Sequence, residues 1–280
     1  MSYKLPTKAV ITDAGFASRF LPITKTIPKA MIPLGAKPIM QYVVEECVAG
    51  GITEIIIVAT PEGKPIYEDY FNNPVEKIEK QLASQGKQDR FESVKAVLDM
   101  ANITVIEQDP SLPYGNGSPI ASAKPYLNKD EAFVALYSDD LIFGASDVKT
   151  LLEAYRQRPE VEAIIMAQEM PKELWHKYGM IALKDIEKHT LSHIVEKPKR
   201  PELSPSNLTS YGRYLLTPDI FEQLLPENIG LDDELWTADA ITKLAKIGDV
   251  LVAKSEGEWL TTGDPKNYAK AFTRFQQLNQ

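Results

Sequence analysis

The chain has one cysteine and three histidines among its 280 residues. A single cysteine excludes an internal disulfide, and the position of Cys47 on the apolar side of an expected helix predicts a core residue rather than a nucleophile. The histidines are scattered, so they do not form the ligand cluster of a zinc site, and we expect surface or packing roles for His176, His189 and His193. The sequence therefore argues against a disulfide framework and against zinc or thiol chemistry.

Long apolar runs are also missing. No segment approaches about 18 consecutive apolar residues, and residues 1–8 lack the apolar core of a secretion signal, so we expect a cytoplasmic protein that does not enter a membrane. With 31 basic against 39 acidic residues, the formal net charge is -8. An acidic balance argues against nucleic acid as a general partner, whereas a small phosphorylated ligand remains compatible.

Acidic residues are absent from one stretch, between Ala14 and Val44, although the protein as a whole is acidic. The stretch follows the apolar segment 9–11, turns at Gly15 and contains four prolines, each of which fixes a backbone dihedral. A run of cations is usually a solvated surface, but the position after a first strand favours a site for a polyanion such as a phosphate chain. Its charged residues are Arg19, Lys25, Lys29 and Lys37.

Apolar runs alternate with helical patterns and predict an α/β fold. A strand at 8–12, a helix at 38–49 and a strand at 52–59 form a βαβ unit. Further strands are expected at 103–106, 133–137, 162–168, 179–183, 191–196 and 210–215, and further helices at 75–84, 90–100, 119–125, 218–225, 237–247 and 265–277. Such alternation predicts a mixed, mostly parallel central sheet covered on both faces, with ligands at the carboxyl ends of its strands.

Two carboxylates, Asp139 and Asp140, follow the expected strand 133–137 directly. Magnesium takes one or two protein carboxylates and completes its shell with phosphates and water, so a divalent cation fits this position. The alternative is an Asp pair that caps the next element, which is common. The nearby cationic loop favours the metal.

Two shorter motifs offer weaker signals. The turn at residues 115–118 can bring backbone close to a planar base, or present helix N-terminal amides to a phosphate. Glu196 and Lys197 end another expected strand and place an acceptor beside a cation, which suits sugar hydroxyls and a sugar phosphate. Alone, each has a structural explanation, and for the Glu-Lys pair that explanation is an exposed ion pair.

Taken together, several segments resemble the signature of sugar-1-phosphate nucleotidylyltransferases, and more narrowly the bacterial UTP-glucose-1-phosphate uridylyltransferase family: residues 14–22, 24–25, 27–29, 31–33, 37–38, 41–47, 51–55, 195–198, 206–208, 212–214 and 238–241. The resemblance covers nearly the whole chain. It implies a Rossmann-like three-layer fold of the nucleotide-diphospho-sugar transferase type, as a single domain over residues 1–280. The nucleotide-binding half would span about 1–145, and the sugar-binding half with the C-terminal helices about 146–280.

The resemblance also implies a reaction, in which UTP and glucose 1-phosphate give UDP-glucose and pyrophosphate in the presence of Mg²⁺. The residues implied in catalysis are Arg19, Lys29, Asp139 and Lys197, with Asp139 on the metal. Those implied in nucleotide binding are Ala14, Gly15, Lys29 and Gly117, and those in sugar-phosphate binding are Gly179, Glu196 and Lys197. The family further implies a homo-oligomer, a dimer or a tetramer.

Four positions depart from the family pattern: Ala17, Ala30, Ser118 and Thr261. Ala17 and Ser118 replace a glycine and a histidine, and Ala30 replaces a glutamate. Thr261 replaces a metal-binding aspartate, and a neutral hydroxyl is a poor ligand for Mg²⁺. Two hypotheses follow: an active uridylyltransferase, or a catalytically impaired homologue that binds nucleotide or nucleotide sugar as a regulatory or partner protein. A nucleotidylyltransferase for another base or sugar is a third.

Overall fold

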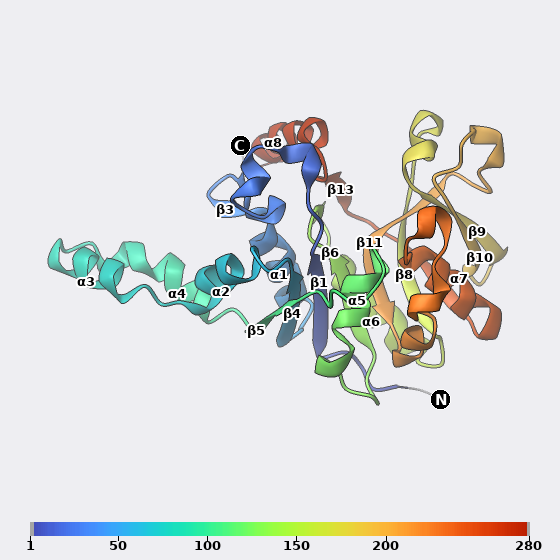
Figure 1. Ribbon diagram of the computed structural model, residues 1–280, viewed down its shortest axis with the longest axis horizontal. Coiled ribbons are helices and arrows are strands. Elements are labelled where there is room, and N and C mark those ends of the chain that lie inside the picture. The colour runs from blue at the N-terminus through green and yellow to red at the C-terminus, as the bar shows by residue number, and fades with distance from the viewer. Residues whose placement is uncertain (1–2, 279–280) are drawn as a thin grey trace.

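A computed structural model describes residues 3–278 of the chain, which form a nine-stranded sheet between helical layers (Figure 1). The strand order is β5-β4-β1-β6-β11-β8-β12-β10-β9. The strands are β1 (Lys8–Asp13), β4 (Glu54–Ala59), β5 (Asn102–Glu107), β6 (Phe133–Tyr137), β8 (Ala163–Glu169), β9 (Gly179–Asp185), β10 (Thr190–Glu196), β11 (Leu208–Leu216) and β12 (Val250–Lys254). From β5 to β6 neighbouring strands are parallel, whereas β11 pairs antiparallel with β6, β8 and β9. The predicted mixed α/β sheet is confirmed.

The central strands are almost wholly apolar because the sheet is covered on both faces. In β1, Ala9 and Ile11 belong to one apolar cluster, whereas Val10 belongs to the other. This division follows from the two-residue period of a strand, which sends successive side chains to opposite faces. A continuous apolar run, rather than alternation with polar residues, is typical of such a doubly covered strand.

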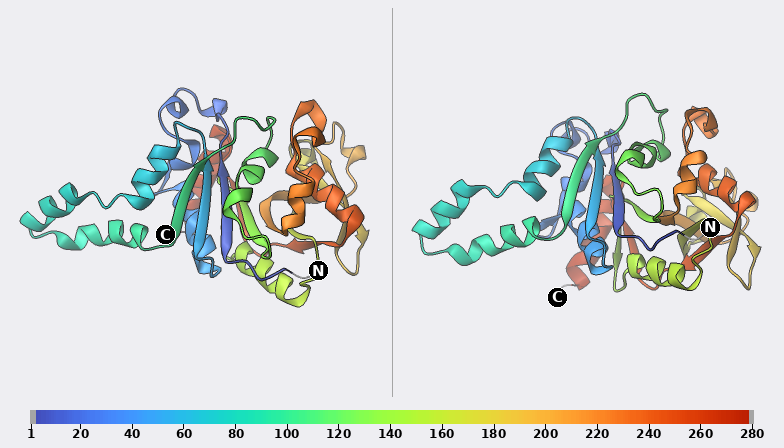
Figure 2. Two further views of the ribbon diagram at one scale, coloured as in Figure 1. Left: turned by 60° about the horizontal axis from the view of Figure 1, so that its bottom comes forward. Right: turned by 90° about the horizontal axis from the view of Figure 1, so that it is seen from below.

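Helices pack against each face of the sheet (Figures 1 and 2). The helices of the described residues are α1 (Ile39–Ala49), α2 (Lys64–Asn72), α3 (Glu76–Ser84), α4 (Glu92–Leu98), α5 (Gly117–Ser122), α6 (Asp147–Gln157), α7 (Thr237–Ile247) and α8 (Pro265–Leu278), and not all of them contact the sheet. Buried residues of α1 and α6 join the first cluster, and those of α5 and α7 join the second. Helices α3 and α4 extend away from the sheet as a hairpin. Within residues 3–278, no helix is long and apolar enough to cross a membrane.

Several elements differ from the sequence prediction. Helices α2 and α6, and strand β12, were not expected. Ser146 supplied a signal for α6, because its hydroxyl accepts a hydrogen bond from the Lys149 amide at the start of the helix. The expected helix at 218–225 is only a 3₁₀ turn, Pro218–Glu222. Pro226 disfavours helical backbone at Leu225 and so limits the helix there.

Short strands flank the carboxyl edge of the sheet. β2 (Pro33–Leu34) pairs with β3 (Lys37–Pro38), and β7 (Asp140–Phe143) pairs with β13 (Glu258–Thr261). The second pairing places Thr261 opposite Asp140. A segment close to the C-terminus is thereby fixed beside the turn that follows β6.

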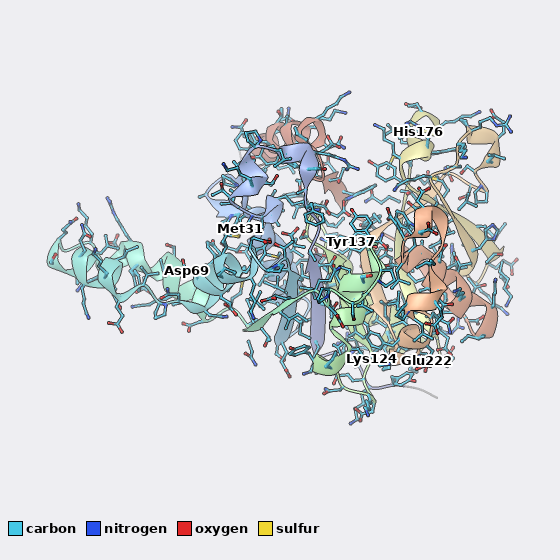
Figure 3. All side chains as sticks on the ribbon, viewed as in Figure 1. Met31, Asp69, Lys124, Tyr137, His176 and Glu222 are labelled. Carbon is cyan, nitrogen blue, oxygen red and sulfur yellow. The ribbon has the colours of Figure 1, made fainter. Side chains whose placement is uncertain are left out.

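Cys47 is fully buried, and burial raises the pKa of its thiol, so the group stays protonated and the predicted core role is confirmed. The three histidines are exposed. His176 lies at the periphery of the molecule, whereas Tyr137 lies near its centre (Figure 3). The described histidines therefore take the surface positions expected of them.

Candidate active site

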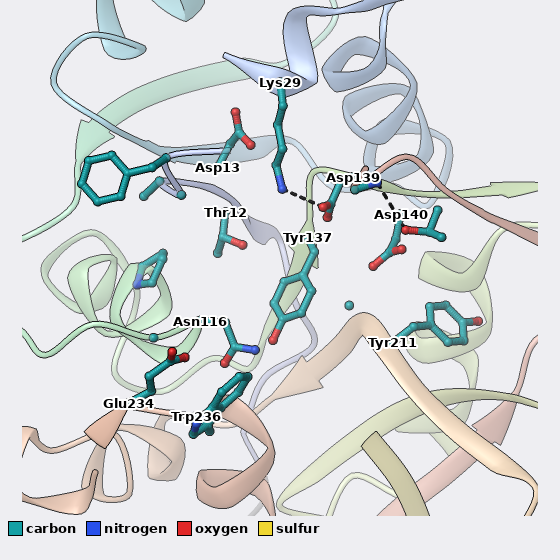
Figure 4. Close-up of a pocket in the computed structure, with 18 of the residues that line it drawn as sticks. Thr12, Asp13, Lys29, Asn116, Tyr137, Asp139, Asp140, Tyr211, Glu234 and Trp236 are labelled. Atoms are coloured by element: carbon teal, nitrogen blue, oxygen red, sulfur yellow. Dashed lines mark hydrogen bonds and ion pairs between the residues drawn. The ribbon is translucent and has the colours of Figure 1, made fainter. Parts of the chain in front are cut away.

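A cavity of about 1130 Å³ opens at the carboxyl ends of β1, β4, β5 and β6 (Figure 4). Its volume lies at the upper end of the range for small-molecule sites. Residues from both halves of the chain line it. The predicted site residues on its wall are Ala14, Gly15, Arg19, Lys29, Asp139, Gly179, Glu196 and Lys197.

Gly117 lies behind this wall. Its amide donates to the Leu235 carbonyl at 2.8 Å, and the neighbouring Gly115 and Asn116 line the cavity instead. Gly115 has φ +138°, and a Cβ there would lie 2.4 Å from the Leu235 carbonyl oxygen, so a side chain is excluded. The Asn116 side chain accepts from the Thr237 amide at 2.8 Å. The glycine turn at 115–118 is therefore hydrogen-bonded to the segment 235–237 in the second half of the chain. Contact between Gly117 and a base stays a prediction.

Two of the four cations in the stretch between Ala14 and Val44 line the cavity, Arg19 and Lys29. The Lys29 ammonium lies 2.6 Å from the Asp139 carboxylate, and Figure 4 shows the two side chains pointing toward each other. Arg19 is exposed on the wall and makes no ion pair within residues 3–278. Lys37 instead pairs with Glu45 at 2.7 Å, away from the cavity. Positive charge is thus concentrated at Arg19 and Lys29.

The four positions that depart from the family pattern differ in burial and in whether they line the cavity. Ala17 has φ +47° in the turn before the 3₁₀ helix Ser18–Phe20, so the strain expected there is present. Ala30 is fully buried in the core, and the buried Ser118 hydroxyl donates to the Pro113 carbonyl. Neither Ala30 nor Ser118 lines the cavity, whereas Thr261 does. Thr261 is therefore the departure with the most direct access to a ligand.

Asp139 and Asp140 are adjacent residues after β6, and their pKa values shift in opposite directions. Burial would raise the pKa of Asp139, but the charge and the hydrogen bond of Lys29, with smaller contributions from a backbone hydrogen bond and from the charge of Arg213, together hold this pKa below its ordinary value. Burial, together with the charge of Asp139, raises the pKa of Asp140 to about 6. The Trp259 indole donates to Asp140 at 2.7 Å. Both carboxyl groups line the cavity, and the ionised form is favoured more strongly at Asp139 than at Asp140.

The donor set suits a magnesium ion held jointly with phosphates. Within residues 3–278, no group of three acidic, histidine or cysteine side chains is arranged around one metal position. Asp264 lines the cavity, but its carboxylate accepts from the Lys266 and Asn267 amides at the start of α8. Mg²⁺ requires only one or two protein carboxylates when phosphates complete its shell, so Asp139 fits this ion.

A buried arginine, absent from the predicted site, supports the turn that carries Asp139. Arg213 has no exposed surface, and its Nε and Nη2 donate to the Glu46 carboxylate at 3.2 and 3.1 Å. Its Nη1 donates to the Tyr137 carbonyl at 3.1 Å, and Nη2 donates to the Asp140 carbonyl. These carbonyls flank Asp139, so Arg213 fixes the turn on both sides.

Asp13 is a second residue of the cavity wall that the sequence analysis did not identify. Its carboxylate accepts hydrogen bonds from the Ser138 hydroxyl at 2.7 Å and from the Tyr67 hydroxyl. A carboxylate at the end of the first strand was a usable sequence signal, of the same kind that identified Asp139.

Thr262 also supports the turn that carries Asp139, because its amide and hydroxyl donate to the Asp139 carbonyl at 2.6 and 2.9 Å.

The opposite wall carries Glu196 and Lys197 at the end of β10. A Cβ on Gly179 would lie 2.9 Å from a Glu196 carboxylate oxygen, so the glycine makes room for that side chain. Burial raises the pKa of Glu196, although Lys197 opposes the shift. The Lys197 ammonium lies 3.6 Å from Glu196 and 4.6 Å from the centre of the Trp236 ring.

Cationic side chains and a carboxylate thus lie at the carboxyl edge of the sheet, which is the edge where α/β proteins of this kind bind nucleotides. The family model described as "Nucleotidyl transferase" matches residues 8–277. The chain belongs to this nucleotidyl transferase family.

Individual relatives narrow the comparison. The chain is 38% identical over 266 residues to UTP-glucose-1-phosphate uridylyltransferase 2 of Staphylococcus saprophyticus, covering 94% of this chain and 89% of the relative. A solved UDP-glucose pyrophosphorylase complexed with UDP-glucose matches with a TM-score of 0.83 and 30% identity over 98% of this chain and 99% of that one. A UTP-bound UGPase from Acinetobacter baumannii matches with a TM-score of 0.84 and 29% identity over 97% and 93% of the two chains.

Proposed function

We propose that the protein forms UDP-glucose and pyrophosphate from UTP and glucose 1-phosphate in this cavity. The observation that carries the proposal is that the pairs Lys29–Asp139 and Glu196–Lys197 line one cavity. Two phosphorylated substrates require two such cationic positions. The named activities of the relatives and the ligands of the two solved structures support this choice of substrates.

The arrangement suits direct attack of one phosphate on another. An oxygen of the glucose 1-phosphate phosphate attacks the α-phosphorus of UTP, and the bond to the β-phosphate breaks to release pyrophosphate. Arg19 and Lys29 hold the triphosphate and offset its developing charge, while Lys197 holds the attacking phosphate. Positioning and charge neutralisation are sufficient for phosphoryl transfer, so no covalent intermediate is required.

Asp139 is the residue that would hold Mg²⁺ together with the phosphates of UTP. A bound Mg²⁺ supplies neutralising charge and orients the phosphates. Ala14 and Gly15 lie at the end of β1, where their backbone can meet the uracil. Gln108 also lines the cavity, and its amide offers the donor and acceptor that a base edge requires.

The wider setting of the enzyme belongs to the same proposal. A reaction that consumes UTP fits the cytoplasm, where nucleoside triphosphates are made. Residues 1–280 are proposed to act as one domain, since strands from both halves share the large sheet. A homo-oligomer, dimer or tetramer, follows from the family resemblance and is measurable by sedimentation.

Product analysis tests the proposed reaction. We expect phosphorus NMR to show UDP-glucose and pyrophosphate formed in equal amounts from UTP, glucose 1-phosphate and Mg²⁺. Parallel reactions with ATP, CTP, GTP or dTTP, and with other hexose 1-phosphates, are expected to be slower. No product with any pair would contradict the proposal, and faster turnover of another pair would reassign its substrates.

A further inference from the structure

Trp236 shares the cavity wall with Lys197 and lies on the opposite side of the cavity from Lys29 (Figure 4). The ammonium of Lys197 stands over the Trp236 ring, 4.6 Å from its centre. Tryptophan offers the strongest cation–π surface of the aromatic side chains. The geometry is therefore an attractive contact between a cavity cation and a neutral partner.

Two acidic side chains, Glu196 and Glu234, line the same cavity as Lys197. The Lys197 ammonium is 3.6 Å from Glu196, longer than a charge-assisted hydrogen bond of about 2.7–2.9 Å. A lysine that closed fully on either carboxylate would hide its own charge. It would also occupy the acceptor that a sugar hydroxyl needs.

The backbone at this position reinforces the arrangement. Lys197 has φ +43°, a conformation that a non-glycine residue adopts at a cost, and its amide donates to the Tyr178 carbonyl at 3.2 Å. The side chain itself is half-exposed and has four rotatable bonds. The backbone therefore sets the direction in which the chain leaves β10, while the aromatic ring limits where its ammonium can go.

We propose that Trp236 is a positioning residue that holds the Lys197 ammonium away from Glu196 before the sugar phosphate binds. The phosphate dianion then draws the lysine off the ring, because a charged partner attracts an ammonium more strongly than an aromatic face does. This inference rests on the proposed function, and it adds a residue that acts through Lys197 on the affinity for the second substrate.

Kinetics of three variants provide the first test. We expect Trp236→Leu to raise the KM for glucose 1-phosphate by about three- to tenfold with the KM for UTP unchanged, and Trp236→Phe to restore most of the loss. Trp175→Phe is the matched control, since the Trp175 indole donates to the Met170 carbonyl and does not line the cavity. Equal KM values for glucose 1-phosphate in wild type and Trp236→Leu would overturn the proposal.

Tryptophan fluorescence provides a readout that a merely structural role would not give. Emission of an indole responds to a nearby charge, so glucose 1-phosphate added without UTP is expected to change the emission of the wild type and of Trp175→Phe. The change is expected to be absent from Trp236→Phe and from Lys197→Met. An identical change in Trp236→Phe would assign the signal to Trp259 and contradict the proposal.

The two tests separate this proposal from the proposed function. Failure of the wild type to make UDP-glucose, with the fluorescence pattern intact, would reject the reaction and keep the Trp236–Lys197 coupling. If the wild type makes UDP-glucose and Trp236→Leu has the same KM for glucose 1-phosphate, the proposed reaction stands and the role of Trp236 is rejected.

Discussion

The two ends of the cavity are built differently. At the end that carries Asp139, every residue of the turn 137–140 forms a hydrogen bond with another part of the chain. At the end that carries Lys197, this lysine is half-exposed, and its ammonium lies 3.6 Å from the Glu196 carboxylate and over one aromatic ring. The end proposed for the metal and triphosphate is thus preorganised, whereas the other retains an adjustable cation.

The end that carries Asp139 is supported by a buried charged pair, Arg213 and Glu46. Removing Arg213 and Glu46 from water costs free energy that their attraction only partly repays, so the pair is weak evidence for stability. Its value lies in fixing the Tyr137 and Asp140 carbonyls. Transition-state stabilisation depends on such fixed charges, because they need no reorganisation during the reaction.

The largest expected effect comes from removing the charge at the preorganised end. Asp139→Asn is expected to lower kcat by about a hundred- to a thousandfold, because it removes the carboxylate that pairs with Lys29 and that we propose as the ligand of Mg²⁺. Steady-state assays with saturating Mg²⁺ measure the loss. Asp264→Asn is the control, since asparagine also caps a helix well and turnover should stay within a few-fold. Equal losses in both variants would remove the special role of Asp139.

Substitution of two neighbouring glutamates on α1 tests the importance of the buried pair between Arg213 and Glu46. Glu46→Gln is expected to lower the free energy of unfolding by about 3–5 kcal/mol, because it leaves the Arg213 charge buried without its partner. Glu45→Gln alters a pair with Lys37 that is partly exposed to solvent and should cost about 1 kcal/mol or less. Urea denaturation compares the two. Similar losses would show that the buried pair has no special importance.

The smallest expected effect concerns Thr261. Thr261→Asp is expected to lower the Mg²⁺ concentration for half-maximal activity by about three- to tenfold, since it adds a carboxylate beside Asp140. Titration of activity with Mg²⁺ makes the measurement, and Thr261→Asn is the uncharged control. If both variants behave alike, position 261 does not reach the metal and the loss of the family's aspartate is without consequence.

The sequence predicted much of this site because its main signals are local. Lys29 belongs to a stretch without acidic residues, and Asp139 follows a strand whose apolar run predicted β6 with its observed bounds. Parallel strands then bring such strand ends to one edge of the sheet.

The supporting residues escaped prediction because their partners are distant in the chain. Arg213 reaches Glu46 across 167 positions, and Asp13 reaches Ser138 across 125. No spacing rule marks such contacts before the fold is known. Trp236 escaped for the same reason, since only the pairing of the segment at 235–237 with the glycine turn brings it to the cavity wall.

The most direct test of the two-ended cavity compares Lys29→Met with Lys197→Met, using calorimetry for UTP and steady-state kinetics for glucose 1-phosphate. Lys29→Met is predicted to raise the Kd for UTP about tenfold or more, since it removes a charge-assisted contact. Lys197→Met is predicted to leave the Kd for UTP within twofold while lowering kcat and raising the KM for glucose 1-phosphate. Equal effects of both variants on both substrates would contradict the assignment of one substrate to each end.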